Sequence, residues 1–207
     1  MLKIWGRKNS SNVRKALWIA HELGLTFQSI DAGGAFGVVD DPHYRDKNPN
    51  GLVPMLEDGD LTLWESNVIV RYLCAQYGGE QGWYSDSPAQ RALAEKWMDW
   101  TTSSLAGAFK PLFWGLLRTA PELRDWTAID AAREQCARLL TIADQALARQ
   151  PYLSGAHIGM GDIPLGCFAY AWFGLPIERP SMPHLEAWYQ RLQARAAYRT
   201  AVMTELT

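Results

Sequence analysis

The chain has 207 residues, of which 48% are hydrophobic and 20% are charged, a composition typical of a globular protein that excludes a largely disordered chain. Its 20 Lys and Arg side chains nearly balance 22 Asp and Glu side chains, so a formal net charge of -2 gives no general attraction for nucleic acid or anionic lipid. The longest notable uncharged stretch, 163–177, is interrupted by prolines and glycines and is too short to cross a bilayer. We therefore expect a soluble protein with no nucleic-acid partner and no membrane partner.

The N-terminal residues lack the charged start, the long apolar centre and the cleavage site of a secretory signal, so we expect a cytoplasmic location. Cys74, Cys136 and Cys167 lie far apart in the sequence, and we expect each to be a small buried hydrophobic side chain. The 4 histidines show no metal-ligand spacing, so the sequence predicts no metal site.

The first eighty residues or so alternate between strand and helix patterns. They predict a strand at 2–5, a helix over 13–23, a strand at 26–30, a hairpin of 55–57 with 61–63, and a helix from Ser66. Asp58-Gly59 is a strong signal for the hairpin turn. Because a crossover through the first helix makes a parallel pair, this order predicts a small mixed sheet in an α/β unit.

The remainder of the chain predicts helices only, over 88–117, 127–149, 162–173 and 184–195. Pro111 predicts a kink in the first of them, and Arg191, Arg195 and Arg199 form a stripe that we expect to face solvent. Glycines and serines between the halves are typical of a linker. The predicted domains are therefore 1–79, a linker at 80–87, and 88–207.

Three segments of the α/β unit could carry chemistry, and the first is Ser10-Ser11-Asn12. These residues precede or open a predicted helix, whose free N–H groups and partial positive charge favour an anion. The alternative is that one of them simply caps the helix.

Val53-Pro54 and Glu65-Ser66 are the other two segments. Proline directly before a strand fits a cis bond that leaves the Val53 backbone free for a peptide-like ligand, although a trans proline that opens the strand is the alternative. Glu65 and Ser66 suit a ligand with both an ammonium and a carboxylate group, although they are also compatible with a plain helix start.

In this order and spacing, these segments resemble the cytosolic glutathione transferases, in particular the serine-type bacterial members. The motifs that carry the resemblance are Ser10-Ser11-Asn12, Asn48 to Pro54, Glu65 to Ile69 with Tyr72-Leu73, Trp97 to Trp100, Tyr152 to Gly155, and Gly161 to Ile163. The resemblance spans essentially the whole chain. It implies a thioredoxin-like N-terminal domain that holds glutathione, an all-helical C-terminal domain that supplies most of the pocket for an electrophile, a homodimer, and a role in detoxification.

The resemblance also implies roles for individual residues. Ser10 takes the position that activates the thiol, with Ser11 and Asn12 as neighbouring candidates. Glu65 and Ser66 suit the γ-glutamyl end of glutathione, and the Val53 backbone, before Pro54, suits its cysteinyl unit. The residue that binds the glycine carboxylate is not assigned, and Lys47 and Asn50 are the candidates. Glutathione is then a co-substrate, and no metal is needed.

A stripe of aromatic and cationic side chains lies on the predicted helix over 88–117. It consists of Phe109, Lys110, Phe113, Trp114 and Arg118. Such a stripe could line a pocket for a partly anionic apolar substrate. The alternative is packing between domains.

Two features leave questions open. Gly159 stands where the family usually has Ser or Thr to form a reciprocal cap with Asp162, so we expect one half of that cap to be missing. The motifs also do not separate a transferase from a glutathione-dependent disulfide reductase or peroxidase. A non-catalytic binding protein with this fold is the second alternative, which the intact Val53-Pro54, Glu65 and Ser66 disfavour.

Overall fold

The computed structural model describes residues 1–207 and divides them into two compact units. The first unit contains Met1–Ser85 together with Arg195–Thr204, and the second contains Asp86–Ala194 together with Glu205–Thr207. Each unit is built around its own buried side chains, and each is described by itself.

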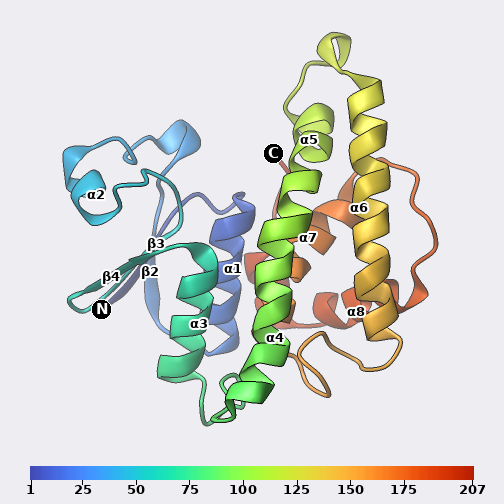
Figure 1. Ribbon diagram of the computed structural model, residues 1–207. Coiled ribbons are helices and arrows are strands. Elements are labelled where there is room, and N and C mark those ends of the chain that lie inside the picture. Colours follow the sequence, from blue (N-terminus) through green and yellow to red (C-terminus); the bar gives the residue numbers. More distant parts are fainter. The chain divides into compact units, whose positions relative to one another are not determined.

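A four-stranded mixed sheet forms the centre of the first unit (Figure 1). Its strands are β1 (Leu2–Trp5), β2 (Phe27–Ile30), β3 (Met55–Asp58) and β4 (Leu61–Trp64), in the order β2-β1-β3-β4. β1 pairs in parallel with β2 and antiparallel with β3, which confirms the predicted mixed sheet. The hairpin differs from the prediction by one residue: Asp58 pairs with Leu61, so the turn is Gly59-Asp60, and Gly59 has a φ of 59°.

Alternating side chains of the strands face different helices. α1 (Ser11–Glu22) and α3 (Ser66–Tyr77) pack together beside the sheet (Figure 1). The short helix α2 (Pro42–Lys47) follows a 3-10 turn at Gly34–Phe36, and its Tyr44 packs with Ala32 and Met55. Because successive side chains of a strand point to opposite faces, Trp5 joins the Tyr44 cluster whereas Ile4 lies in the other layer.

The second unit is entirely helical, as predicted. Its helices are α4 (Pro88–Trp100), α5 (Ala106–Leu117), α6 (Trp126–Leu147), α7 (Asp162–Gly174) and α8 (Pro183–Gln193), with a 3-10 turn at Pro121–Leu123. α5 packs against α6, and α4 packs against α7, whose residues are buried over most of its length. Apolar residues around the whole circumference of α7 explain this central place.

The predicted helix over 88–117 departs from α geometry before its proline. A π-helical turn at Thr101–Leu105 joins α4 to α5, and α5 then continues through Pro111. The Thr101 hydroxyl donates to the Trp97 carbonyl at 2.7 Å inside this region. Pro111 lies inside α5 and does not end the helix.

The C-terminal segment returns to the first unit, although the sequence analysis placed all of 88–207 in the helical domain. α9 (Ala196–Ala201) packs against α1, and Arg195 binds both carboxylate oxygens of Glu22 at 2.7 Å. The expectation of a solvated Arg195 was therefore wrong, because a planar guanidinium matches a carboxylate in two parallel bonds. Arg14, which is 2% exposed, donates to the Thr204 hydroxyl at 2.8 Å. These contacts attach the end of the chain to α1.

Asp162 is the buried polar centre of the second unit. It is 0% exposed, and it accepts from the backbone N–H groups of Leu153, Ser154 and Gly159 and from the Trp188 indole. Burial raises the pKa of the Asp162 carboxyl, and these donors oppose the rise. One side chain thereby joins the loop before α7 to α8.

The cap that Gly159 leaves incomplete is completed by another residue. The Ser154 hydroxyl accepts from the Gly161 N–H at 3.1 Å, at the start of α7. A Cβ atom added at Gly159 would lie 2.8 Å from Ser154 Cβ and 2.9 Å from its hydroxyl oxygen. Ser154 therefore occupies the space that the family's usual side chain at 159 would need, and only glycine fits opposite it.

This arrangement predicts a coupling between positions 159 and 154. Gly159→Ala should lower the free energy of unfolding by about 1–3 kcal/mol through overpacking. In a Ser154→Gly background the same substitution should cost at least about 1 kcal/mol less, because the clashing atoms are gone. Urea unfolding of the two single variants and the double variant measures this difference. Additive effects would show that Ser154 is not the obstacle.

Candidate active site

The N-terminus of α1 is open to a ligand. Ser10 is the N-cap residue, and its carbonyl accepts from the Arg14 N–H at 2.9 Å, but its side chain makes no capping hydrogen bond. The first turn of α1 also contains no acidic residue. A serine at this position normally accepts from a backbone N–H of the first turn. Here the N–H groups and the Ser10 hydroxyl are available to an anion.

The three candidate residues at this helix start differ in their surroundings. Ser10 and Ser11 are half-buried, and neither hydroxyl is bound to another group of the chain. Asn12 is exposed, and its side-chain oxygen accepts from the Ser66 hydroxyl at 3.3 Å. The Asn12 side-chain oxygen is thus engaged with α3, whereas its amide N–H groups and both serine hydroxyls are free to donate.

The start of α3 presents Glu65 and Ser66 to the same region. Glu65 is the N-cap residue, is exposed and has a φ of 73°, which is unusual for a residue with a side chain. Backbone outliers of this kind cluster at ligand sites. Ser66 is 7% exposed and reaches Asn12, so the Glu65-Ser66 and Ser10-Ser11-Asn12 segments lie next to each other.

Val53-Pro54 has a cis peptide bond, as the position of the proline before β3 suggested. No other group of the chain pairs with the Val53 backbone N–H or carbonyl. A Cβ atom added at Gly6, which has a φ of 149°, would lie 3.2 Å from Val53 Cβ and would overlap Val13. Gly6 therefore lets the Val53 turn approach the start of α1 closely, and all three predicted segments meet in one part of the first unit.

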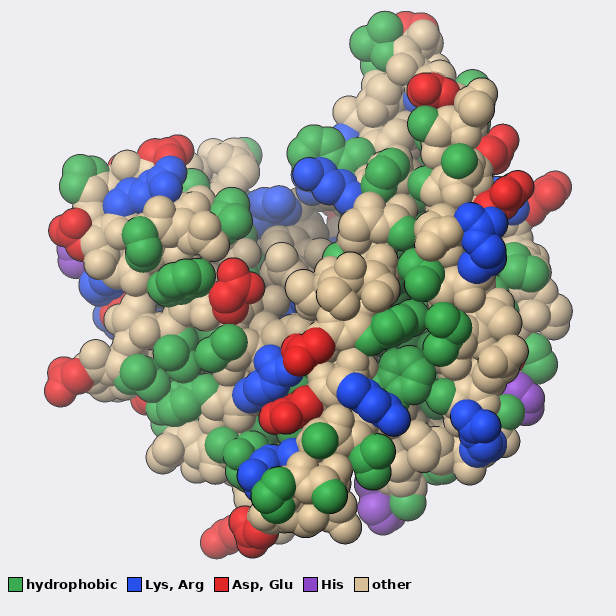
Figure 2. Space-filling model, viewed as in Figure 1, with side chains coloured by type: hydrophobic (Ala, Val, Ile, Leu, Met, Phe, Trp, Pro, Cys, Tyr) green, Lys and Arg blue, Asp and Glu red, His purple; other side chains and the backbone are tan.

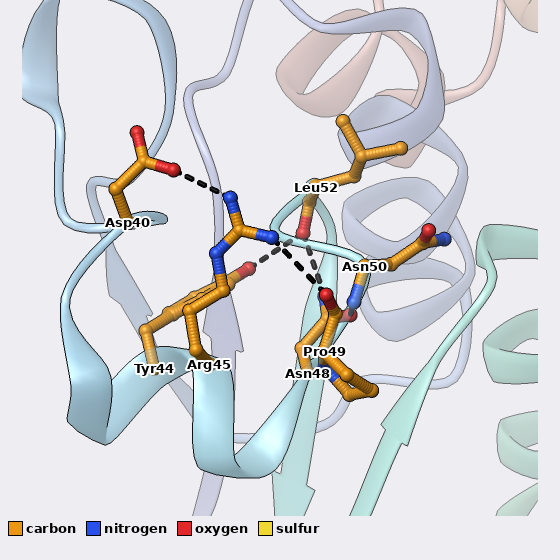
Figure 3. A network of polar contacts seen from close by, with 7 residues as sticks. All are labelled: Asp40, Tyr44, Arg45, Asn48, Pro49, Asn50 and Leu52. Carbon is orange, nitrogen blue, oxygen red and sulfur yellow. Dashed lines mark hydrogen bonds and ion pairs between the residues drawn. The ribbon is translucent and has the colours of Figure 1, made fainter.

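Two side chains fix the turn that leads to Val53 (Figure 3). The Tyr44 hydroxyl and the Asn48 amide each donate to the Leu52 carbonyl at 2.7 Å. Asn48, which is 1% exposed, also accepts from the Asn50 N–H at 3.2 Å. Burial raises the pKa of the Tyr44 hydroxyl, so it remains a donor at neutral pH.

Lys47 and Asn50, the two candidates for binding the glycine carboxylate of glutathione, differ in whether their side chains are already bound to another group of the chain. The Lys47 ammonium is already paired with Glu57 at 3.0 Å, and this ion pair holds α2 against β3. The Asn50 side chain is exposed and is not bound within the chain (Figure 3). Asn50 is therefore the better placed of the two residues.

The stripe on α5 forms a stack within the second unit. Lys110 and Arg118 each lie 5.1 Å from the ring centre of Trp114, which is 48% exposed. Arg118 also lies over Phe113 at 5.7 Å and donates to the Thr207 carbonyl at 3.0 Å. Phe109 is different: it is 3% exposed and packs edge-on against a phenylalanine of α7, so it belongs to the core. The exposed stack combines a flat apolar surface with positive charge.

The structure offers no reactive thiol and no group of metal ligands. Cys74, Cys136 and Cys167 are all buried, and burial raises the pKa of Cys74 and of Cys136 to about 12. No group of three or more His, Cys, Asp or Glu side chains is arranged to hold a metal ion. No helix is long and apolar enough to span a bilayer.

Sequence reasoning missed several residues that shape this site. Gly6 and Tyr44 support the Val53 turn, and Lys15 lies buried against Ser66 and Asn67. Only Lys15 carried a signal, because it is a charged residue inside the apolar pattern of α1. The others act through contacts that depend on the fold.

Comparisons with known proteins show to which proteins this chain is similar. Residues 1–75 match the family model described as "Glutathione S-transferase, N-terminal domain", and residues 127–191 match "Glutathione S-transferase, C-terminal domain". Glutathione S-transferase GstB of Escherichia coli K12 is 47% identical over 205 residues, which cover 98% of both chains. Glutathione S-transferase 3 of Zea mays is 29% identical over 97% of this chain and 93% of its own.

A solved structure is similar over its whole length. It is the theta class glutathione S-transferase of the citrus canker pathogen Xanthomonas axonopodis pv. citri, crystallised with glutathione bound. Its sequence is 61% identical, the TM-score is 0.96, and the match covers 100% of this chain and 99% of that one.

The support for the Val53 turn can be tested by substitution. Asn48→Ala should lower the free energy of unfolding by about 1–3 kcal/mol, because a buried side chain with two hydrogen bonds is lost. Asn50→Ala removes an exposed amide two residues away and should change the free energy of unfolding by less than about 0.5 kcal/mol. Urea unfolding of both variants makes the comparison. Equal effects would mean that Asn48 does not hold the turn.

Proposed function

The chain belongs to the glutathione S-transferase family and is a glutathione transferase, and from this we propose that it activates glutathione as a thiolate that attacks small, mainly apolar electrophiles. The observation that carries the proposal is the uncapped start of α1 with a free Ser10 hydroxyl. The similar Xanthomonas enzyme with bound glutathione supports the identity of the ligand.

Ser10 is the proposed donor to the sulfur. A free thiol has a pKa of about 8.5 and is mostly protonated at neutral pH, whereas a helix N-terminus and nearby donors lower such a pKa to roughly 3.5–7.5. A depression of two units corresponds to about 2.7 kcal/mol of thiolate stabilisation. One hydroxyl bond and the field of α1 are sufficient for this, so no protein base is required. Ser11 and the Asn12 amide, whose oxygen accepts from Ser66, are the alternative donors.

The rest of glutathione fits the neighbouring segments. The exposed Glu65 carboxylate suits the γ-glutamyl ammonium group, and the free N–H groups at the start of α3 with Ser66 suit its carboxylate. The unpaired Val53 backbone beside Pro54 suits the cysteinyl amide, which would bind as an added strand does. Asn50 is the proposed contact for the glycine carboxylate.

The reaction then needs little else from the protein. The thiol proton leaves to solvent when glutathione binds, and the thiolate forms a bond to an electrophilic carbon. The bond from that carbon to its leaving group breaks, and the leaving group takes the electron pair. The protein contributes ionisation of the sulfur and alignment of the two reactants.

The helical unit is proposed to supply contacts for the electrophile from α5. Trp114 and Phe113 offer flat apolar surface, and Lys110 and Arg118 favour a substrate with a partial negative charge. Phe109 supports this surface from the core. The buried cysteines with raised pKa values weigh against any exchange reaction that uses a thiol of the protein.

We further propose a homodimer, a cytoplasmic location and a role in detoxification. Support for the homodimer comes from Leu61, Trp64 and Val68, large apolar side chains of β4 and α3 that are about 40% exposed. Figure 2 shows hydrophobic side chains gathered over this part of the first unit. Patches of this kind commonly mark protein interfaces.

Ser10→Ala tests the activation step. The substitution should lower turnover of an aryl halide with glutathione by about 10- to 1000-fold, as expected for the loss of a donor to a developing or bound anion. Stability should change by less than about 0.5 kcal/mol, because the hydroxyl makes no capping bond, whereas a capping serine contributes about 1 kcal/mol. Steady-state kinetics and urea unfolding measure the two effects.

Ser11→Ala is the matched control, because it removes a free hydroxyl from the adjacent position. It should reduce turnover by less than about threefold. If Ser11→Ala is the inactive variant, the donor is Ser11. If neither variant loses activity, hydroxyl activation of the thiol is wrong.

Glu65→Ala tests the γ-glutamyl site. It should weaken glutathione binding by about tenfold or more, because charge-assisted bonds are worth roughly 1.5–3 kcal/mol. Glu65→Gln should retain part of the affinity through its amide oxygen. Calorimetric titration with glutathione measures all three proteins, and an unchanged affinity of Glu65→Ala would exclude the assignment.

A further inference from the structure

Lys15 is a buried lysine on α1 whose ammonium group faces the start of α3. It lies one helical turn beyond Ser11, and only 2% of it is exposed. Lysine is almost never buried to this extent unless the ammonium group has partners. Its Nζ atom lies 3.3 Å from Ser66 Oγ and 3.4 Å from Asn67 Oδ1. α1 therefore brings a positive charge to the first turn of α3.

The hydrogen-bond directions around Ser66 follow from the chemistry of its neighbours. An ammonium group only donates, so Ser66 Oγ accepts from Lys15. The Ser66 hydroxyl hydrogen is then directed away from Lys15, and in the structure it is donated to Asn12 Oδ1 at 3.3 Å. Because linked hydrogen bonds polarise one another, a hydroxyl that accepts from a cation is a stronger donor. Ser66 Oγ thus accepts from Lys15 and donates to Asn12, and the start of α3 offers an anion its backbone N–H groups next to the Lys15 charge.

The charge of Lys15 adds to that of the helix start. The first turn of α3 holds no acidic residue, and the Glu65 side chain makes no capping bond. The backbone N–H groups of a helix start carry a partial positive charge of their own. A full charge in a buried position acts through a lower effective dielectric than one in water, so its influence on a nearby anion is larger.

We infer that Lys15 is a positioning residue that makes this site prefer a free α-carboxylate on the γ-glutamyl group of glutathione. The inference rests on the proposed function, which places that group at Glu65 and Ser66. Lys15 fixes the orientation of Ser66 and acts on the carboxylate through its charge, and it does not touch the thiol. Its removal therefore affects the affinity for glutathione and the choice between ligands more than turnover at saturation.

Lys15→Met tests the charge with a side chain of similar length. The Michaelis constant for glutathione should rise about 10- to 100-fold, and turnover at saturating glutathione should stay within about threefold of the parent enzyme. Lys15→Arg retains the charge and should recover at least half of the lost affinity on a logarithmic scale. Lys96→Met removes the same net charge from an exposed position on α4 and should leave both constants unchanged.

A ligand with an altered carboxylate separates a charge effect from a general structural effect. The probe is glutathione in which the γ-glutamyl α-carboxylate is replaced by a carboxamide. Calorimetric titration should show that the parent enzyme binds this amide at least about tenfold more weakly than glutathione. Lys15→Met should discriminate between the two by less than about threefold, because the charge that favours the carboxylate is gone.

Each outcome bears on one of the two proposals. If the parent enzyme binds the amide as well as glutathione, or if Lys15→Met keeps the full preference, the inference about Lys15 is overturned while the transferase proposal stands. If the parent enzyme binds neither ligand, the proposed function itself is contradicted. The comparison of the two ligands on the parent enzyme needs no variant, so equal binding of the two overturns the inference even if Lys15→Met does not fold.

Discussion

The proposed chemistry requires that the backbone N–H groups in the first turn of α1 are free to bind a ligand. A helix start has unpaired N–H groups that side chains usually satisfy, and a serine at the N-cap is among the residues best suited to do so. In this chain Ser10 occupies that position without capping, and no acidic side chain takes its place. The helix therefore keeps donors and partial positive charge for an incoming anion, and the proposed anion is the thiolate of glutathione.

The surrounding structure holds this helix start in place from several directions. Asn12 is bonded to Ser66 of α3, Gly6 admits the Val53 turn, and the Arg195–Glu22 ion pair attaches the C-terminal segment to the other end of α1. These are contacts between segments far apart in the sequence. Catalysis by alignment depends on such support, because small displacements of the reacting groups reduce the rate strongly.

Much of the fold and of the candidate site could be predicted from the sequence, and the correct predictions have a common cause. The strands, the long helices and the ends at which Ser10, Val53 and Glu65 lie follow from local periodicity and from short motifs. The ion pair of Arg195 and the completion of the α7 cap by Ser154 could not be predicted, because each needs a partner brought close only by folding. The π-helical turn at Thr101–Leu105 likewise has no periodic signal. The sequence could not show that the Ser10 hydroxyl is free, because a serine that caps a helix and a serine that does not are the same residue in the sequence.

The pKa of the glutathione thiol in the complex reports whether the start of α1 ionises the sulfur. The ultraviolet absorbance of the thiolate can be followed from pH 5 to pH 9 with the tripeptide bound to the parent enzyme, and with Ser10→Ala as the reference. We expect a midpoint at least about one unit below the value of roughly 8.5 for a free thiol, and a smaller depression when the hydroxyl is absent. A bound thiol that titrates as it does in solution would show that the start of α1 does not ionise it.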